Sequence, residues 1–88
     1  IVPRHSRRVR TLVEALGQAL RNRRTSLGMR QQDVADRAGC TATNIYVVER
    51  GERELKVGTL EDLAVAVGCT GWELLRDAMD VKNRAVSP

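Results

Sequence analysis

The sequence contains no Phe, and Trp and Tyr occur once each, so aromatic residues make up 2% of the 88 residues. A core without large aromatic side chains must be built from Leu, Val and Ala, which suits packed helices better than a β-sandwich. No apolar run approaches the ~18 residues that a membrane-spanning helix needs. No signal peptide is visible either, so we expect an intracellular, cytoplasmic protein without a membrane partner.

Cysteine and histidine are also scarce. Cys40, Cys69 and His5 lie far apart in the chain. This spacing matches no common zinc pattern and no disulfide framework, so we expect no metal and no cofactor. An enzyme is not expected, because no paired carboxylates fall in an evident pocket and no activated thiol is present.

Both cysteines lie in a short sequence pattern that occurs twice, since "AGCTAT" and "VGCTGW" share the order small-Gly-Cys-Thr. Gly is suited to end a helix and Thr to begin the next one. A free cysteine between them behaves as a small apolar residue when it is buried. We therefore interpret both thiols as filling gaps at helix corners and favour this over a redox switch.

The charge is unevenly distributed. Residues 1–30 hold eight arginines and one acidic residue, giving +7, whereas residues 31–88 hold seven basic and ten acidic residues, giving −3. A basic start on a small domain indicates an anionic partner, with nucleic acid ahead of a membrane surface. A merely solvated arginine-rich tail is the alternative. Four of these eight arginines lie in the first ten residues: Arg4, Arg7, Arg8 and Arg10.

Helical periodicity and stop signals divide the chain into a basic flexible arm (1–10), a helical domain (11–79) and a loose tail (80–88). The pattern predicts an all-α domain with helices at 12–27, 31–38, 42–50, about 60–67 and 71–79. Thr11, Thr41, Thr59 and Thr70 are the predicted N-caps, and Gly28, Gly39, Gly51 and Gly68 the predicted stops. The residues predicted to face inward are Leu12, Leu16, Ala19, Leu20, Leu27, Val34, Ala35, Ala38, Ile45, Val48, Leu60, Leu63, Ala64, Val67, Leu74, Leu75, Ala78 and Met79.

The second and third predicted helices form a helix-turn-helix. The former ends at Ala38, the turn is Gly39-Cys40-Thr41, and the latter begins at Ala42. Two helices joined by three to four residues with a glycine in the turn define this motif. While Ile45 and Val48 pack inward, the opposite face of the third helix is left to solvent. That face consists of Ala42, Thr43, Asn44, Tyr46, Val47 and Arg50.

At this point the chain resembles the lambda-repressor-like, Cro-type (XRE-like) helix-turn-helix family of small bacterial and phage regulators. The resemblance covers about residues 16–75, and no single residue in it is specific, whereas the set in this order is strong. The residues that carry it are Leu16-Gly17, Leu20-Arg21, Arg24, Leu27-Gly28, Gln31, Val34-Ala35, Gly39, Ile45, Glu49-Arg50-Gly51, Thr59-Leu60, Leu63-Ala64 and Leu74-Leu75.

The resemblance implies a compact five-helix bundle whose third helix enters the DNA major groove with its N-terminal residues first. The positions implied to read bases are Ala42, Thr43, Asn44, Tyr46 and Val47. The candidates for phosphate contacts are Arg30, Gln31, Thr41, Arg50, Arg53 and Lys56, with a solvated surface charge as the alternative for Arg53 and Lys56. Arg24 and Glu49 match the family's structural ion pair.

The sequence departs from the family pattern in three places. Arg30 replaces the usual Ser or Thr cap of the second helix, so that end either frays or relies on another group. Leu55 stands where a proline is common. Trp72 replaces a polar residue and, with Leu75 and Met79, forms a candidate dimer interface, because Trp is enriched at interface cores. Packing of Trp72 on the first helix or on the arm is the equal alternative.

Together these features predict a sequence-specific double-stranded DNA-binding transcriptional regulator, with a repressor favoured, that binds a two-fold symmetric operator as a homodimer. The arm would follow the DNA backbone or enter a minor groove. The alternative is a protein-interaction module of the same fold, antitoxin-like or an assembly partner, with weak or no DNA binding. Since the first residue is Ile, a fragment or processed chain with a missing domain or protein partner stays open.

Overall fold

The computed structural model describes residues 11–86, and the predicted arm at residues 1–10 lies outside the described part. The described residues form five helices and no strand, which confirms the predicted all-α fold class. The helices are α2 (Leu12–Ser26), α3 (Gln31–Ala38), α4 (Ala42–Glu49), α5 (Val57–Ala66) and α6 (Gly71–Val86).

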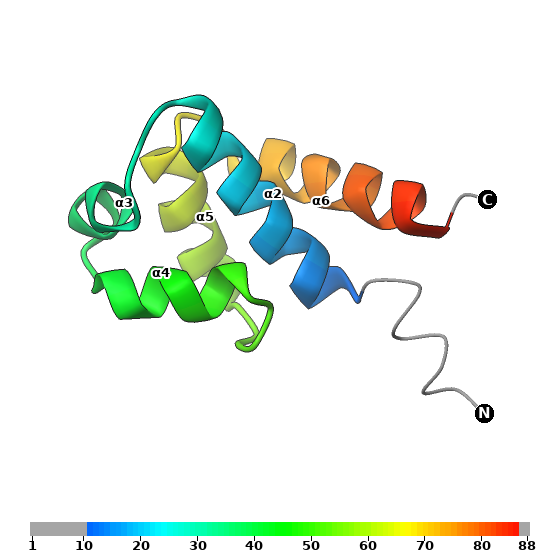
Figure 1. The fold of residues 1–88 in the computed structure, drawn as a ribbon, viewed down its shortest axis with the longest axis horizontal. Coiled ribbons are helices and arrows are strands. Elements are labelled where there is room, and N and C mark those ends of the chain that lie inside the picture. The colour runs from blue at the N-terminus through cyan, green and yellow to red at the C-terminus, as the bar shows by residue number, and fades with distance from the viewer. Residues whose placement is uncertain (1–10, 87–88) are drawn as a thin grey trace.

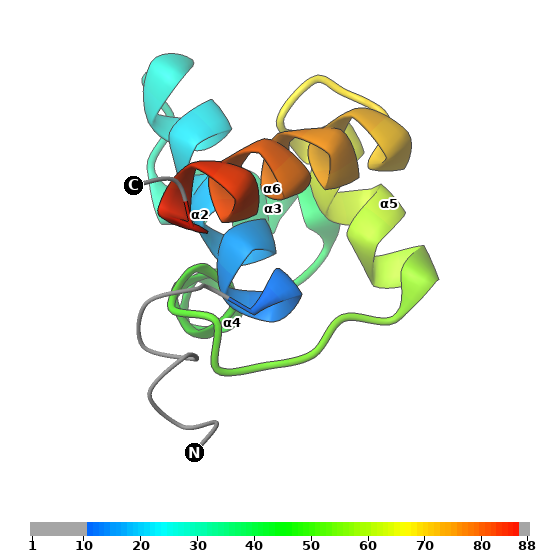
Figure 2. The same cartoon turned by 90° about the vertical axis from the view of Figure 1, so that its right-hand side faces the viewer.

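The longest helices, α2 and α6, pack along each other, and α3 and α4 lie together at one end of the molecule (Figure 1). Helix α5 contacts both α3 and α6. An extended loop, residues 50–56, carries the chain from the end of α4 to the start of α5 along one edge (Figure 2). This arrangement places α4 on the outside of the bundle, where one of its faces is open to solvent.

Each of the five helices contributes at least one large aliphatic side chain to the core. One such side chain from each helix is at most 1% exposed. In the order α2 to α6, these residues are Leu20, Val34, Ile45, Leu63 and Leu74. Burial of a side chain of this size contributes ~1.5–3 kcal/mol relative to leaving it exposed. The five helices are therefore held as one unit by a core that contains no aromatic ring.

The N-caps form as predicted at three of the four threonines. The Thr11 side chain accepts a hydrogen bond from the Glu14 N–H at 3.1 Å, and the Glu14 carboxylate accepts one from the Thr11 N–H at 3.1 Å. At the start of α6, the Thr70 N–H donates to the Glu73 carboxylate at 2.9 Å. This bond lowers the pKa of Glu73 below its ordinary value.

The prediction that Thr59 caps the fourth helix is wrong, because α5 begins at Val57 with Lys56 at the N-cap. The Lys56 carbonyl accepts a hydrogen bond from the Leu60 N–H at 2.9 Å, so the helical pattern already starts there. The sequence analysis assigned this first turn of α5 to a loop because it contains Gly58, and glycine is a poor helix former.

The predicted end of the last helix at residue 79 is also wrong, because α6 continues through the expected loose tail to Val86. Val81 packs against the core and continues the stripe of Leu74 and Ala78 by one further turn. Three residues predicted to face inward are instead substantially exposed. They are Leu12 (39%), Leu27 (55%) and Met79 (43%).

Gly17 marks the closest approach between α2 and α4. A Cβ atom added at this glycine would lie 2.3 Å from the carbonyl oxygen of Val48 and 2.8 Å from that of Glu49. Both contacts are with backbone atoms, which cannot move aside as the end of a side chain can. The backbones of the two helices therefore touch at this point, and only glycine fits.

Replacing Gly17 with alanine is expected to lower the free energy of unfolding by about 3 kcal/mol, because the new methyl group overpacks the contact between α2 and α4. Gly58→Ala is the matched control, since an added Cβ at this helical glycine meets nothing within 4 Å. The control should raise stability by ~0.4–1 kcal/mol. Urea unfolding followed by circular dichroism measures both, and equal stabilities would contradict the proposed contact.

Candidate nucleic-acid interface

The turn between α3 and α4 is set by its three residues. Gly39 adopts a left-handed φ of +76°, and the Cys40 N–H donates to the Ala35 carbonyl at 3.0 Å. The Thr41 hydroxyl then accepts a hydrogen bond from the Asn44 N–H at 3.1 Å and caps α4. The turn predicted from the sequence is therefore present, and it brings α4 across α3.

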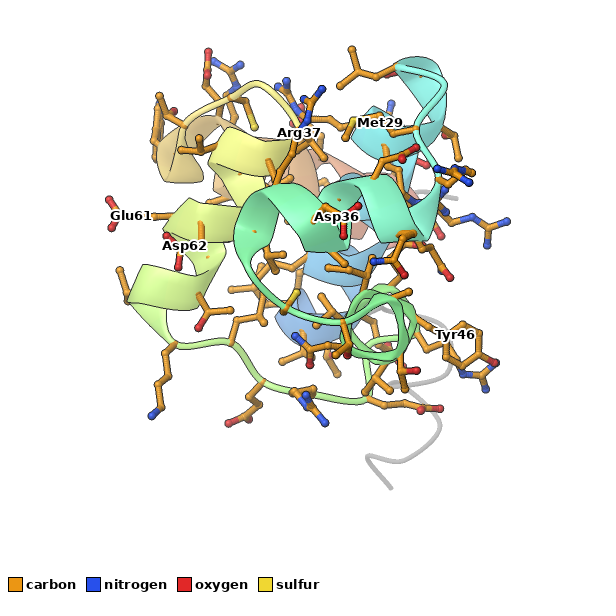
Figure 3. The ribbon with its side chains drawn as sticks, turned by 90° about the vertical axis from the view of Figure 1, so that its left-hand side faces the viewer. Met29, Asp36, Arg37, Tyr46, Glu61 and Asp62 are labelled. Carbon is orange, nitrogen blue, oxygen red and sulfur yellow. The ribbon has the colours of Figure 1, made fainter. Side chains whose placement is uncertain are left out.

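Helix α4 has a buried face and a solvent face. Ile45 and Val48 are at most 1% exposed, whereas Thr43, Tyr46 and Arg50 are exposed at spacings of three and four residues along one stripe. Figure 3 shows Tyr46 projecting outward from α4. The other positions proposed to read bases are half-buried on the flanks of this stripe: Ala42, Asn44 and Val47.

The last residue of α4 is tied to α2 and α3. The Arg24 guanidinium donates two hydrogen bonds to the Glu49 carboxylate, at 2.6 and 2.9 Å, and a third to the Met29 carbonyl at 2.9 Å. The Gln31 side-chain amide donates to the same carboxylate at 3.1 Å. The Arg24 and Glu49 side chains are 12% and 4% exposed.

The hydrogen bond to the Glu49 carboxylate raises the pKa of Arg24 above its ordinary value. In residues 11–86, no buried side-chain nitrogen or oxygen lacks a hydrogen-bond partner. The paired charges therefore hold α4 at a fixed angle to α2 without leaving an unsatisfied polar group behind. Gln31, assigned to phosphate from the sequence, also braces the recognition helix through this network.

The start of α3 does not depend on a Ser or Thr cap. The Asp33 carboxylate accepts a hydrogen bond from the Arg30 N–H at 2.8 Å and forms an ion pair with the Arg30 guanidinium at 2.9 Å. The hydrogen bond from the Arg30 side chain lowers the pKa of Asp33. Asp33 therefore supplies the capping group that the sequence pattern lacked, and Arg30 remains largely exposed beside it.

Arg53 lies beside the first turn of α4. Its guanidinium donates a hydrogen bond to the side-chain carbonyl of Asn44, although the two residues are nine positions apart. From the sequence, Arg53 appeared only as a candidate phosphate contact in a loop. The fold brings it to the same surface as Asn44, whereas Lys56 is exposed at the start of α5.

Neither cysteine has the surroundings of a reactive thiol. Cys69 is buried, and desolvation raises the pKa of its thiol. Cys40 is half-buried and packs against the core, as expected for a residue that fills a helix corner. Residues 11–86 contain no group of three or more Cys, His, Asp or Glu side chains that could hold a metal ion.

A second exposed surface lies where α5 and α6 begin. Trp72 is 68% exposed and lines an apolar groove with Val57, Leu60 and Leu75. Such exposure is incompatible with packing of Trp72 into the core against α2. Sequence reasoning missed Val57, which is 75% exposed, because the residue was assigned to a loop rather than to a helix.

No helix within residues 11–86 is long and apolar enough to cross a membrane. A family model described as a helix-turn-helix domain matches residues 15–78 of the chain. No curated protein matches the sequence. The similarity to solved structures is strong, and three of them illustrate it.

The first is the clp gene regulator ClgR from Corynebacterium glutamicum, which is 27% identical with a TM-score of 0.80 over 84% of this chain and 95% of that chain. The second is the restriction-modification controller protein C.AhdI from Aeromonas hydrophila, which is 35% identical with a TM-score of 0.66 over 72% and 90%. The controller protein C.Esp1396I, a tetramer in complex with its natural 35 base-pair operator, shares the fold at 24% identity, with a TM-score of 0.68 over 77% and 95%.

Replacing Glu49 with glutamine should lower the free energy of unfolding by about 3 kcal/mol, because the Arg24 charge is then left buried without an opposite charge. Glu52→Gln is the control, since Glu52 pairs with Arg50 at an exposed site. The control should cost less than ~1 kcal/mol. Chemical denaturation measures both variants, and an equally small loss in the two would show that the Arg24–Glu49 pair does not anchor α4.

Proposed function

Because the chain belongs to the helix-turn-helix domain family, we propose that it is a sequence-specific double-stranded DNA-binding transcriptional regulator, with α4 in the major groove. The observation that carries the proposal is the solvent face of α4, whose exposed stripe is backed by buried Ile45 and Val48. A rigidly anchored helix with one free face has the width and shape that the major groove admits. Two of the similar structures are described as a gene regulator and a controller protein.

Thr43 and Asn44 are the leading base readers in the first turn of α4. Asn pairs bidentately with adenine, Thr contacts several bases, and Ala42 and Val47 suit the methyl group of thymine. Arg53 joins this set, because its guanidinium reaches Asn44 and is the group that pairs with guanine. The phosphate contacts assigned to Arg30, Gln31, Thr41 and Lys56 would fix the register on the duplex.

The distribution of charge supports the same orientation. Figure 3 shows Asp36 on the outer face of α3 and Glu61 and Asp62 projecting from α5, away from Tyr46. Glu61 and Asp62 therefore lie on the opposite side from Tyr46 and would point away from DNA that α4 approaches. The four arginines of the N-terminal arm lie outside the described residues. We propose that they follow the DNA backbone or enter a minor groove: Arg4, Arg7, Arg8 and Arg10.

The regulator would act as a homodimer, with the groove at Trp72 covered by the same groove of a second copy. The groove exposes a large aromatic ring beside Val57, and such an apolar patch on a small domain marks an interaction site. Leu75 lines this groove, and Met79, which is 43% exposed one turn further along α6, would extend the contact between the two copies. A two-fold dimer reads two half-sites about one helical turn apart, and its occupancy of an operator would repress transcription.

A protein-interaction module of the same fold is the second candidate. The observation in its favour is the same apolar groove, which a different partner could cover. A DNA-binding experiment distinguishes the two candidates, because the regulator would bind duplex DNA and the interaction module would bind it weakly or not at all. An enzyme is not proposed, and a DNA-binding regulator would work in the cytoplasm, where bacterial DNA lies.

Selection of bound sequences from random duplex DNA should return a palindromic consensus. The double variant Thr43→Ala with Asn44→Ala should then lose about 1–3 kcal/mol of discrimination for each contacted base pair, because a direct contact is removed. The composition-matched control is Asn22→Ala with Thr25→Ala on α2, which should keep the wild-type preference. Absence of any enriched sequence would favour the interaction module, and unchanged specificity in the first variant would refute the role of α4.

Trp72→Ala should raise the dimer dissociation constant roughly 30-fold, which corresponds to the ~2 kcal/mol typical of an interface anchor. Sedimentation equilibrium measures this constant. Val65→Ala is the control, because Val65 is 71% exposed on α5 but does not line the groove. If both variants dimerise like the wild type, the groove is not the dimer interface.

A further inference from the structure

A cleft opens between α2 and α4 beside the start of α3, and most of the residues that line it are polar or charged. They are Arg21, Arg24, Gln31, Tyr46, Glu49 and Arg50. Three guanidinium groups and one carboxylate therefore surround one concave site. The site adjoins the solvent stripe of α4, since Tyr46 and Arg50 belong to both.

The three arginines of the cleft differ in how many hydrogen bonds and ion pairs they form within the protein. The Arg24 guanidinium donates its hydrogen bonds to Glu49 and Met29 inside the protein. Arg21 is exposed on α2, and its guanidinium forms no hydrogen bond or ion pair with residues 11–86. Arg50 pairs with Glu52, but both side chains are more than half exposed, and such surface pairs exchange readily. The Arg21 guanidinium is therefore available to an anion, and that of Arg50 becomes available when its exposed pair with Glu52 opens.

Tyr46 fixes the direction of Arg50. The Arg50 guanidinium lies over the Tyr46 ring, 5.6 Å from its centre, and donates a hydrogen bond to the phenol oxygen at 3.3 Å. A cation held over an aromatic face gains ~0.5–1 kcal/mol at an exposed site. Together with Glu52, the ring thus orients Arg50 beside the cleft that Tyr46, Arg50 and Arg21 line.

We propose that this cleft binds a phosphodiester group of the DNA backbone between Arg21 and Arg50, with Tyr46 as the positioning residue for Arg50. The inference rests on the proposed DNA-binding function and extends it to α2, which sequence analysis did not assign to DNA. A guanidinium presents a planar fork of donors that matches two phosphate oxygens. In this proposal, the DNA strand that borders the groove entered by α4 would pass the cleft, because Tyr46 and Arg50 line both the cleft and the solvent stripe of α4.

Two consequences distinguish this assignment from the sequence-based one. Arg21 becomes a phosphate contact, although no motif marked it as one. Tyr46, which the sequence analysis placed among the base readers, instead acts through Arg50 and carries no base preference of its own. Both residues should then affect affinity for all sequences to a similar extent, because phosphate contacts hold no sequence information.

The test measures the affinity of the full chain for duplex DNA against salt concentration. With ~0.9 counterions released per phosphate contact, Arg21→Gln should reduce the slope of log affinity against log salt by about 0.9 per bound protomer. The affinity in 0.1 M salt should fall about eightfold per protomer, alike for consensus and unrelated sequences. Arg84→Gln on α6 removes the same charge far from α4 and should leave the slope unchanged.

Two further variants separate the roles. Arg21→Lys keeps the charge and should restore most of the slope. Tyr46→Phe should weaken binding equally for all sequences, and a change of preference at a single base pair would return Tyr46 to the base readers. Circular dichroism confirms that each variant keeps its helices, as expected for exposed positions.

The outcomes separate the two proposals. A wild-type chain that binds no duplex overturns the proposed function and this inference with it. A wild-type chain that binds duplex with the same slope as Arg21→Gln overturns this inference alone. Titration with inorganic phosphate, followed by the NMR signals of the arginine side chains, covers the other source of the same chemistry. Binding of free phosphate at Arg21 without any effect on the DNA slope would assign the cleft to a free anion.

Discussion

The position of α4 depends on the contact between Arg24 and Glu49. This ion pair joins the last residue of α4 to α2, and the Arg24 guanidinium also binds the carbonyl of Met29 in the turn before α3. Charges buried to this extent are costly unless each finds partners, and in residues 11–86 no buried side-chain nitrogen or oxygen lacks one. Gly17 completes the constraint, because the absent side chain lets the backbone of α2 touch that of α4. The helix therefore has one orientation rather than a range of them.

Anchoring α4 at its C-terminal end has a consequence for recognition. The first turn, with Thr43 and Asn44, extends away from the pair and is held from the other side by the turn after α3. Recognition surfaces are most precise when they stand on rigid elements whose own side chains are packed. The buried face of α4 supplies this rigidity through Ile45 and Val48, and its solvent face is then free to carry specificity.

The two proposed interaction surfaces use different physical forces and lie on different elements. The surface around α4 is polar and arginine-rich, which suits a partner of negative charge. The groove around Trp72 lies between the starts of α5 and α6 and is apolar, which suits burial against protein. Since they lie on different elements, the two proposed surfaces do not compete for the same side chains.

The helices, the turn and the family could be predicted from the amino-acid sequence. These features are local, because periodicity, a threonine cap or a glycine with positive φ acts within a few residues. Where local signals conflicted, as at Gly58 or along the continued stripe to Val81, the predicted boundaries of α5 and α6 were wrong. Three other features of the two surfaces depend on how the helices pack and could not be predicted. Arg53 meets Asn44, and Arg21 and Arg50 share a cleft. Val57 extends the groove of Trp72. These pairs are distant along the chain, and their contacts exist only because packing of the helices closes the distance between them.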